Sequence, residues 1–300
     1  MLRCAVCRGT LESTGPGYSC RSCKRLYPEE EGIFRFKGET PAKEYHFPEG
    51  GFDILYRSEE GSFWFQVRNR IIGALLSRYV SKDARLLEVG CGTGFVAGYL
   101  KQQGYRIECA DLFLEGLNYC RKRGSGYAYY QYDLYDPVFS EEFDVVLACD
   151  VIEHLEDDAR VLANLNRSLK KGGILLITVP ACQGIWSDID EYAGHKRRYS
   201  RDEMKKKLEA AGFRVLRSSY FMMLLFPAIA LSRMRMGRRE TPGNRQHEGL
   251  VERAKGELSL PPTLNSFFGR IFALEVPIIS HMDLPIGSSL VTVALKEREP

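Results

Sequence analysis

The segment ARLLEVGCGTGF at residues 84–95 decides the fold of this chain. Its first six residues, 84–89, have the apolar character of a short buried strand, and they run directly into Gly90, Gly92 and Gly94. A glycine-rich turn between a strand and a helix lets the backbone approach a ligand closely, with the helix amides pointing at it. We therefore predict a ligand-binding turn here, followed by a helix.

Strands and helices alternate along much of the remaining chain. Buried strands that alternate with helices form a mostly parallel sheet covered on both faces. The sequence therefore predicts an α/β fold with a doubly wound, seven-stranded, mostly parallel sheet. After the strand at residues 84–89, the predicted strands lie at residues 105–111, 126–133, 142–150, 174–180, 213–221 and 287–296.

The residues around the turn indicate the class of cofactor. Asp111 follows Gly90 by 21 residues, at the end of the second strand, where an acid can accept the hydroxyls of a ribose. A dinucleotide fold would place a third glycine where Phe95 stands. Glu88 precedes the first glycine, and its carboxylate suits a cationic ligand and opposes a pyrophosphate. S-adenosylmethionine, which carries an amine and a sulfonium, therefore fits this site better than NAD.

Four motifs in order resemble those of class I S-adenosylmethionine-dependent methyltransferases. They are LLEVGCGTG, ADL, YD and FDVVLACDVIEHL, and the likeness covers roughly residues 85–216. It implies that Gly90 and Gly92 flank the methionine part of the cofactor and that Asp111 takes the ribose. Leu112 would pack on the adenine, and Asp133 with Leu134 would contact its amino edge. The alternative is that Asp111 and Asp133 are ordinary turn residues. The predicted cofactor-binding set is Glu88, Gly90, Gly92, Gly94, Asp111, Leu112, Asp133, Leu134 and Cys149.

Four cysteines near the N-terminus have the spacing of a zinc site. Cys4 and Cys7 form one Cys-x2-Cys pair, and Cys20 and Cys23 form a second after twelve intervening residues. Two such pairs complete a tetrahedron around Zn²⁺ and leave no position open for water, so the predicted site is structural. The alternatives are two disulfides or a redox Cys-x-x-Cys.

The N-terminal segment also resembles the zinc-ribbon family that includes small activator subunits of tRNA and protein methyltransferases. The likeness runs from residue 4 to residue 36, and it implies a ribbon fold and a recruiting role. The other five cysteines are expected to be small buried hydrophobic residues. They are Cys91, Cys109, Cys120, Cys149 and Cys182.

We predict three parts in the chain: a zinc ribbon at residues 1–39, a linker with a lead-in helix at 40–83, and a methyltransferase domain at 84–300. The domain carries a helical insertion, residues 222–284, before its last strand. We favour a helical cap over the substrate pocket, because Pro227 and Pro277 interrupt the apolar runs. The alternative is peripheral membrane contact through residues 222–239 and 264–281.

Two segments after the fourth and fifth strands are candidates for the acceptor side. His154, in an EHL motif shared with ubiquinone-pathway O-methyltransferases, is the predicted catalytic base; otherwise it is a packing or capping residue. His195, Arg197, Arg198 and Tyr199 are predicted to hold the acceptor's charge, the alternative being a solvated basic loop.

The composition of the chain argues against some classes of binding partner. The chain has 300 residues, a net charge of +3 and 44% hydrophobic residues, without the concentrated basic excess of a nucleic-acid binder. Its longest apolar run, residues 220–231, is too short to span a bilayer, and no signal peptide is recognisable, so we expect a cytoplasmic protein.

The sequence thus predicts methyl transfer from S-adenosylmethionine to a small-molecule or lipid-precursor acceptor, at oxygen. An acidic or phosphate-bearing acceptor is expected. The alternatives are an RNA methyltransferase that grips its substrate with the ribbon, and a non-catalytic module that binds the cofactor. No feature of the sequence indicates an oligomeric state.

Overall fold

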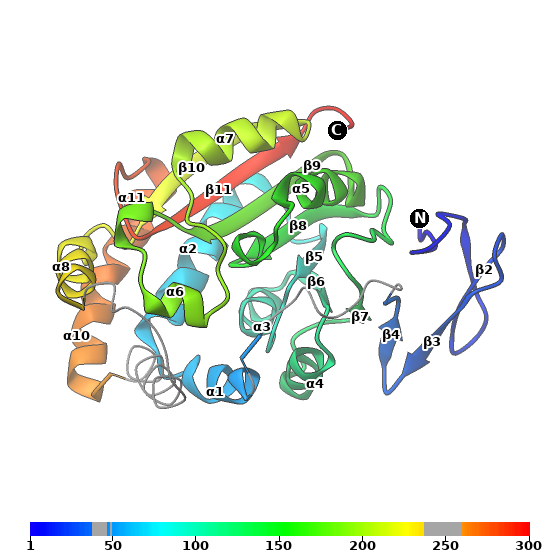
Figure 1. Ribbon diagram of the computed structural model, residues 1–300, viewed down its shortest axis with the longest axis horizontal. Coiled ribbons are helices and arrows are strands. Elements are labelled where there is room, and N and C mark those ends of the chain that lie inside the picture. The colour runs from blue at the N-terminus through cyan, green and yellow to red at the C-terminus, as the bar shows by residue number, and fades with distance from the viewer. Residues whose placement is uncertain (38–46, 49, 237–259) are drawn as a thin grey trace.

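A computed structural model describes residues 1–37, 47–48, 50–236 and 260–300. Seven strands of the described chain after residue 84 lie in the order β7-β6-β5-β8-β9-β11-β10 (Figure 1). All neighbours among β7, β6, β5, β8 and β9 pair in parallel, whereas β11 pairs antiparallel with both β9 and β10. The predicted mostly parallel sheet is confirmed. The seven strands are β5 (Arg85–Val89), β6 (Arg106–Asp111), β7 (Tyr129–Gln131), β8 (Phe143–Cys149), β9 (Leu169–Pro180), β10 (Phe213–Phe221) and β11 (Ser289–Lys296).

The two faces of the sheet carry separate apolar cores. In β5, Leu86 and Leu87 point to opposite faces, as the period of two residues along a strand requires. Because helices cover both faces, the central strands are mostly apolar and do not alternate regularly with polar residues. One core includes side chains of α5 (Asp158–Ser168) and α7 (Arg201–Ala210). The other includes side chains of α2 (Phe63–Tyr79), α3 (Phe95–Gln102) and α4 (Leu114–Arg123).

The N-terminal ribbon extends this sheet. Its strands are β1 (Leu11–Ser13), β2 (Gly17–Cys20), β3 (Leu26–Glu30) and β4 (Ile33–Arg35), and β4 pairs in parallel with β7, which makes one sheet of eleven strands. The backbone N–H of Phe36 donates to the carbonyl of Gln131 over 2.7 Å. The Phe36 ring is fully buried 6.2 Å from the ring of Tyr130. The ribbon therefore shares its core with the large domain.

The insertion before β11 packs mainly against α2, and its first helix also contacts the segment that follows β9. Its described helices are α8 (Phe226–Met236), α10 (Pro262–Ala273) and α11 (Glu275–His281), and both α10 and α11 contact α2. Phe272 of α10 stacks on Phe221, with ring centroids 6.2 Å apart. Phe267 and Leu274 are more than half exposed. Residues 237–239 of the segment considered for membrane contact lie outside the described residues.

None of the helices in the described part of the chain combines the length and the apolar character that a membrane crossing requires.

Candidate functional site

The turn after β5 has the backbone of a ligand-binding loop. Gly90, Gly92 and Gly94 all have positive φ, between 50° and 76°. A Cβ at Gly90 would lie 2.5 Å from a methyl group of Val151, and one at Gly94 would lie 2.4 Å from the sulfur of Cys120. Both positions therefore require glycine for their conformation and for their close packing.

Asp111 at the end of β6 is fixed beside this turn. Its carboxylate accepts hydrogen bonds from the backbone N–H groups of Gly92 and Phe113, each over 2.8 Å. Burial raises the pKa of Asp111 to about 6, against the lowering effect of those two donors. The carboxylate thus reaches the cavity from the position that a ribose-binding acid would occupy.

Glu88 is a second buried acid at the same place. It is 2% exposed, and its Oε2 has no hydrogen-bond partner among the residues that the structure describes. Burial raises the pKa of Glu88 well above its usual value. A buried carboxylate oxygen without a donor favours a ligand that brings one, and the amine of S-adenosylmethionine is such a group. The residues at this end fit the predicted cofactor.

A cavity of about 470 Å³ extends from the glycine turn to His154 and His195. All members of the predicted cofactor set line it except Gly94. Sequence reasoning missed a group of lining residues in the stretch that it assigned to a linker and a lead-in helix. They are Phe47, Phe52 in α1 (Gly51–Ser58), Glu59, and Trp64, Phe65 and Arg68 in α2. The aromatic cluster FWF ahead of an arginine was the available signal.

Arg68 binds the acid that follows β8. Its guanidinium donates to the carboxylate of Asp150 and lies 4.7 Å from the centroid of the Trp64 ring. Asp150 has a φ of 57°, a conformation that residues other than glycine rarely adopt. The pair joins α2 to the carboxyl end of β8, next to the turn that holds His154.

His154 and His195 face each other at the end of the cavity beyond β8. Their ring centroids are 4.9 Å apart, and His154 lies in a single 3₁₀ turn, Ile152–His154, directly after β8. Burial, and then the neighbouring His195, lower the pKa of His154 to about 4. Its imidazole is therefore neutral at physiological pH. Nδ1 of His195 lies 2.9 Å from the carboxylate of Asp190 in α6 (Asp188–Tyr192).

The remaining three residues of the predicted acceptor set are paired with acids inside the protein. Arg197 lies 3.0 Å from the carboxylate of Asp158, and Arg198 lies 2.7 Å from that of Asp190. Tyr199 is fully buried and donates to Asp158. None of the three lines the cavity, because these acids turn their side chains inward. Lys196, which belongs to the same basic run, does line the cavity.

The insertion does not cap the cavity through any of its described residues. The reason is topological: β10 and β11 lie at one end of the sheet, so a connection between them reaches α2 before it reaches the central strand ends. The expectation of a cap over the substrate is corrected for this part of the insertion. The walls are supplied by the lead-in helices and by residues 189–196.

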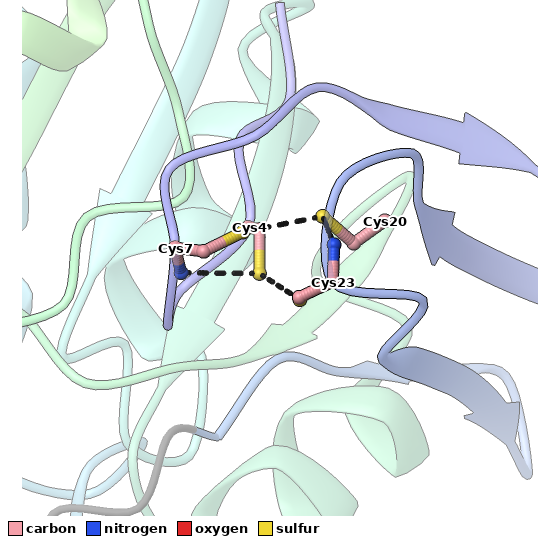
Figure 2. A group of neighbouring side chains, drawn as sticks. All are labelled: Cys4, Cys7, Cys20 and Cys23. Carbon is pink, nitrogen blue, oxygen red and sulfur yellow. Dashed lines mark hydrogen bonds between the residues drawn. The ribbon is translucent and has the colours of Figure 1, made fainter.

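The four N-terminal cysteines form one cluster. Figure 2 shows them facing one another from two loops, with Sγ–Sγ distances of 3.6 Å between Cys4 and Cys23 and 3.4 Å between Cys7 and Cys20. These distances exceed a disulfide bond and approach the separation of about 3.8 Å expected for thiolates around tetrahedral Zn²⁺. All four sulfurs lie within 4.8 Å of one another. The donor set fits a structural zinc ion.

The other cysteines are largely buried, as predicted. Cys91, Cys109, Cys120 and Cys149 are each less than 9% exposed, and Cys182 is half-buried. Cys149 lines the cavity at the end of β8.

A family model described as a methyltransferase domain matches residues 58–218. The chain belongs to this family. It is 27% identical over 132 residues to the malonyl-[acyl-carrier protein] O-methyltransferase of Hamiltonella defensa, covering 42% of this chain and 51% of that protein. It is 28% identical over 135 residues to the ubiquinone biosynthesis O-methyltransferase of Rickettsia bellii, covering 43% and 54%. The chain thus spans about half the length of these two curated relatives.

Solved methyltransferases share the fold. A chain from the complex between the Haloferax volcanii Trm112 methyltransferase activator and a methyltransferase superposes with a TM-score of 0.51 at 17% identity. The match covers 82% of this chain and 98% of that chain. The predicted class I methyltransferase fold is therefore confirmed.

Proposed function

We propose that this methyltransferase transfers a methyl group from S-adenosylmethionine to a hydroxyl oxygen of a small molecule. One observation carries the proposal: a single cavity connects the acids Glu88 and Asp111 with the two histidines His154 and His195. The acids suit a cationic nucleoside, and the histidines suit a hydroxyl. The names of the two curated relatives, both O-methyltransferases, support oxygen as the target.

The cofactor lies across the ends of β5 and β6 in this proposal. Gly90 and Gly92 let the backbone approach its methionine part, and Glu88 accepts a hydrogen bond from its amine. Asp111 accepts the ribose hydroxyls, while Asp133 contacts the adenine. The group supplies an electrophilic methyl on a sulfonium, and the protein's task is to align an acceptor with it and exclude water.

The acceptor has an apolar body. The cavity walls beyond the cofactor loop carry aromatic rings, among them Phe52, Trp64 and Tyr192. Since Arg197 and Arg198 are committed to internal ion pairs, an acidic group on the acceptor would meet Lys196, which pairs with the exposed Glu156. A lipid precursor with a hydroxyl and one anionic group fits these walls.

His154 is the proposed base, because it lies at the acceptor side and is neutral at physiological pH. It accepts a hydrogen bond from the hydroxyl and orients the oxygen lone pair toward the methyl group.

The test supplies methyl-labelled S-adenosylmethionine to the protein together with fractionated metabolite and lipid extracts. We expect label in a non-aqueous fraction, and we expect His154→Ala to lower turnover of that acceptor about 100-fold or more. His281→Ala, which changes an exposed histidine outside the cavity, is the matched control and should leave turnover unchanged. Binding of the cofactor without methylation of any fraction would reject catalysis and favour a binding module.

A further inference from the structure

Glu153 is a buried acid that the proposed mechanism does not use. It lies in the 3₁₀ turn after β8 and is 0% exposed. Neither of its carboxylate oxygens has a hydrogen-bond partner among the residues that the structure describes. Because burying an unpaired carboxylate is strongly unfavourable, a missing partner is expected at this position.

The neighbouring acids differ from Glu153 in having close cationic partners. Asp150 is paired with Arg68, Asp190 with Arg198, and Asp158 with Arg197. The nearest basic side chain to Glu153 is the imidazole of His195, whose Nε2 lies 4.0 Å from Oε1. The arginines of this region are therefore already engaged, and Glu153 remains open to a cation from outside the chain.

The imidazoles of His154 and His195 lie close to the Glu153 carboxylate. One ligand atom from each of Glu153, His154 and His195 lies within 4.8 Å of the others. Nδ1 of His195 is 2.9 Å from Asp190, which fixes the ring so that Nε2 faces Glu153. Metal-binding histidines commonly have such a carboxylate on the second ring nitrogen. Asp190 is itself held at 2.7 Å by Arg198.

We propose that Glu153, His154 and His195 bind one divalent transition-metal ion at the acceptor side of the cavity. One carboxylate and two imidazoles suit Mn²⁺, Fe²⁺ or Zn²⁺ better than Mg²⁺ or Ca²⁺, which favour oxygen ligands alone. Three protein ligands leave coordination positions open, and both histidines line the cavity.

The open positions give the ion a role that rests on the proposed function. The acceptor's hydroxyl oxygen takes one position, which lowers the hydroxyl pKa so that its proton passes to water. An oxygen lone pair then forms the bond to the methyl carbon as the carbon–sulfur bond breaks, and neutral S-adenosylhomocysteine leaves. The ion keeps its oxidation state. The ion thereby replaces His154 as the group that removes the hydroxyl proton: His154 binds the ion, and of the proposed function this role keeps the methyl transfer to oxygen.

The test measures metal binding directly. Protein holding a single zinc ion per chain, which the four thiolates take in preference to the harder carboxylate–imidazole site, is titrated with Mn²⁺, and free Mn²⁺ is followed by electron paramagnetic resonance. We expect one Mn²⁺ per chain. Binding should weaken at least tenfold in Glu153→Gln and in His195→Ala. Glu156→Gln, which alters an exposed acid three residues further along, should bind as the wild type does.

Affinity for S-adenosylhomocysteine in the same variants shows that each has folded. A wild-type protein that binds no Mn²⁺, or a Glu153→Gln variant that binds it normally, would overturn the site. If a variant does not fold, the histidine ring signals in the nuclear magnetic resonance spectrum of the wild type provide the test. Bound Mn²⁺ should broaden the signals of two histidines. Histidine signals that stay sharp would reject the proposal. Methylation that proceeds without metal binding rejects only the metal site, whereas metal binding without any methylation rejects only the proposed function.

Discussion

Arg68 shows how a single residue outside the recognised motifs organises the site. It is 7% exposed, pairs with Asp150 across 82 residues of sequence, and lies against the Trp64 ring. Nothing in the local sequence around either residue indicates this pairing, because it depends on where α2 packs. The glycines of the turn and Asp111 could be predicted because their roles follow from their position on one strand–turn–helix unit.

The residues after β8 and β9 likewise differ in how far the sequence predicts their positions. His154 and His195 could be placed at the strand ends from the sequence, since both follow parallel strands. The internal pairing of Arg197 with Asp158 could not, because the two residues belong to segments that meet only in the folded chain. A basic run by itself indicates charge and does not indicate where the charge points.

Replacing Arg68 tests its structural role. Arg68→Ala leaves the Asp150 carboxylate without its partner in a mostly buried place, so we expect the free energy of unfolding to fall by about 3 kcal/mol. Arg70→Ala, at an exposed position of the same helix, should change it by less than about 0.5 kcal/mol. Urea unfolding of both variants measures the difference. Equal stabilities for the two would show that the pair contributes little.

Strand β4 joins the ribbon, which we predicted as a separate part of the chain, to the sheet of the large domain. Its parallel pairing with β7 was not predictable, because the partner strand lies far along the chain and has no distinguishing sequence. The packing of the insertion against α2 was not predictable either. An apolar helix can cover a pocket, lie on a membrane surface or pack against another helix, and its sequence is compatible with all three. Strands β5 and β8 were predicted well because each is a short apolar run before a turn.

The shared core of ribbon and domain predicts the effect of losing zinc. Cys20→Ser removes one ligand and loosens the support of Tyr27 and Phe36, which are buried in the same core as β5 and β8. We expect the zinc content to fall and the thermal midpoint of the whole chain to drop by about 5 °C or more, at about 2–4 °C per kcal/mol. Calorimetry with metal analysis measures both.

Cys182→Ser is the matched control, since that cysteine lies outside both the ribbon and the core. If Cys20→Ser loses zinc but keeps the wild-type midpoint, the ribbon folds independently of the sheet.

At the scale of the whole molecule, the ribbon and the insertion lie at opposite ends of one sheet (Figure 1). The cavity lies at the ends of the central strands. Strand order brings β5, β6 and β8 side by side, so the glycine turn, Asp111 and the turn that holds His154 converge although they span residues 88–154. This convergence could be predicted from the alternation of strands and helices alone. The aromatic walls from residues 47–68 could not, because they precede the sheet in the sequence and reach the cavity only by packing.

The central claim is that this cavity binds S-adenosylmethionine, and titration calorimetry with S-adenosylhomocysteine tests it most directly. We predict one binding site per chain in the wild type. In Asp111→Ala the loss of a charged acceptor for two hydroxyls should weaken binding by about 2–3 kcal/mol, or some 30- to 150-fold. A wild-type protein that binds no S-adenosylhomocysteine, or binds NAD in its place, would contradict the account.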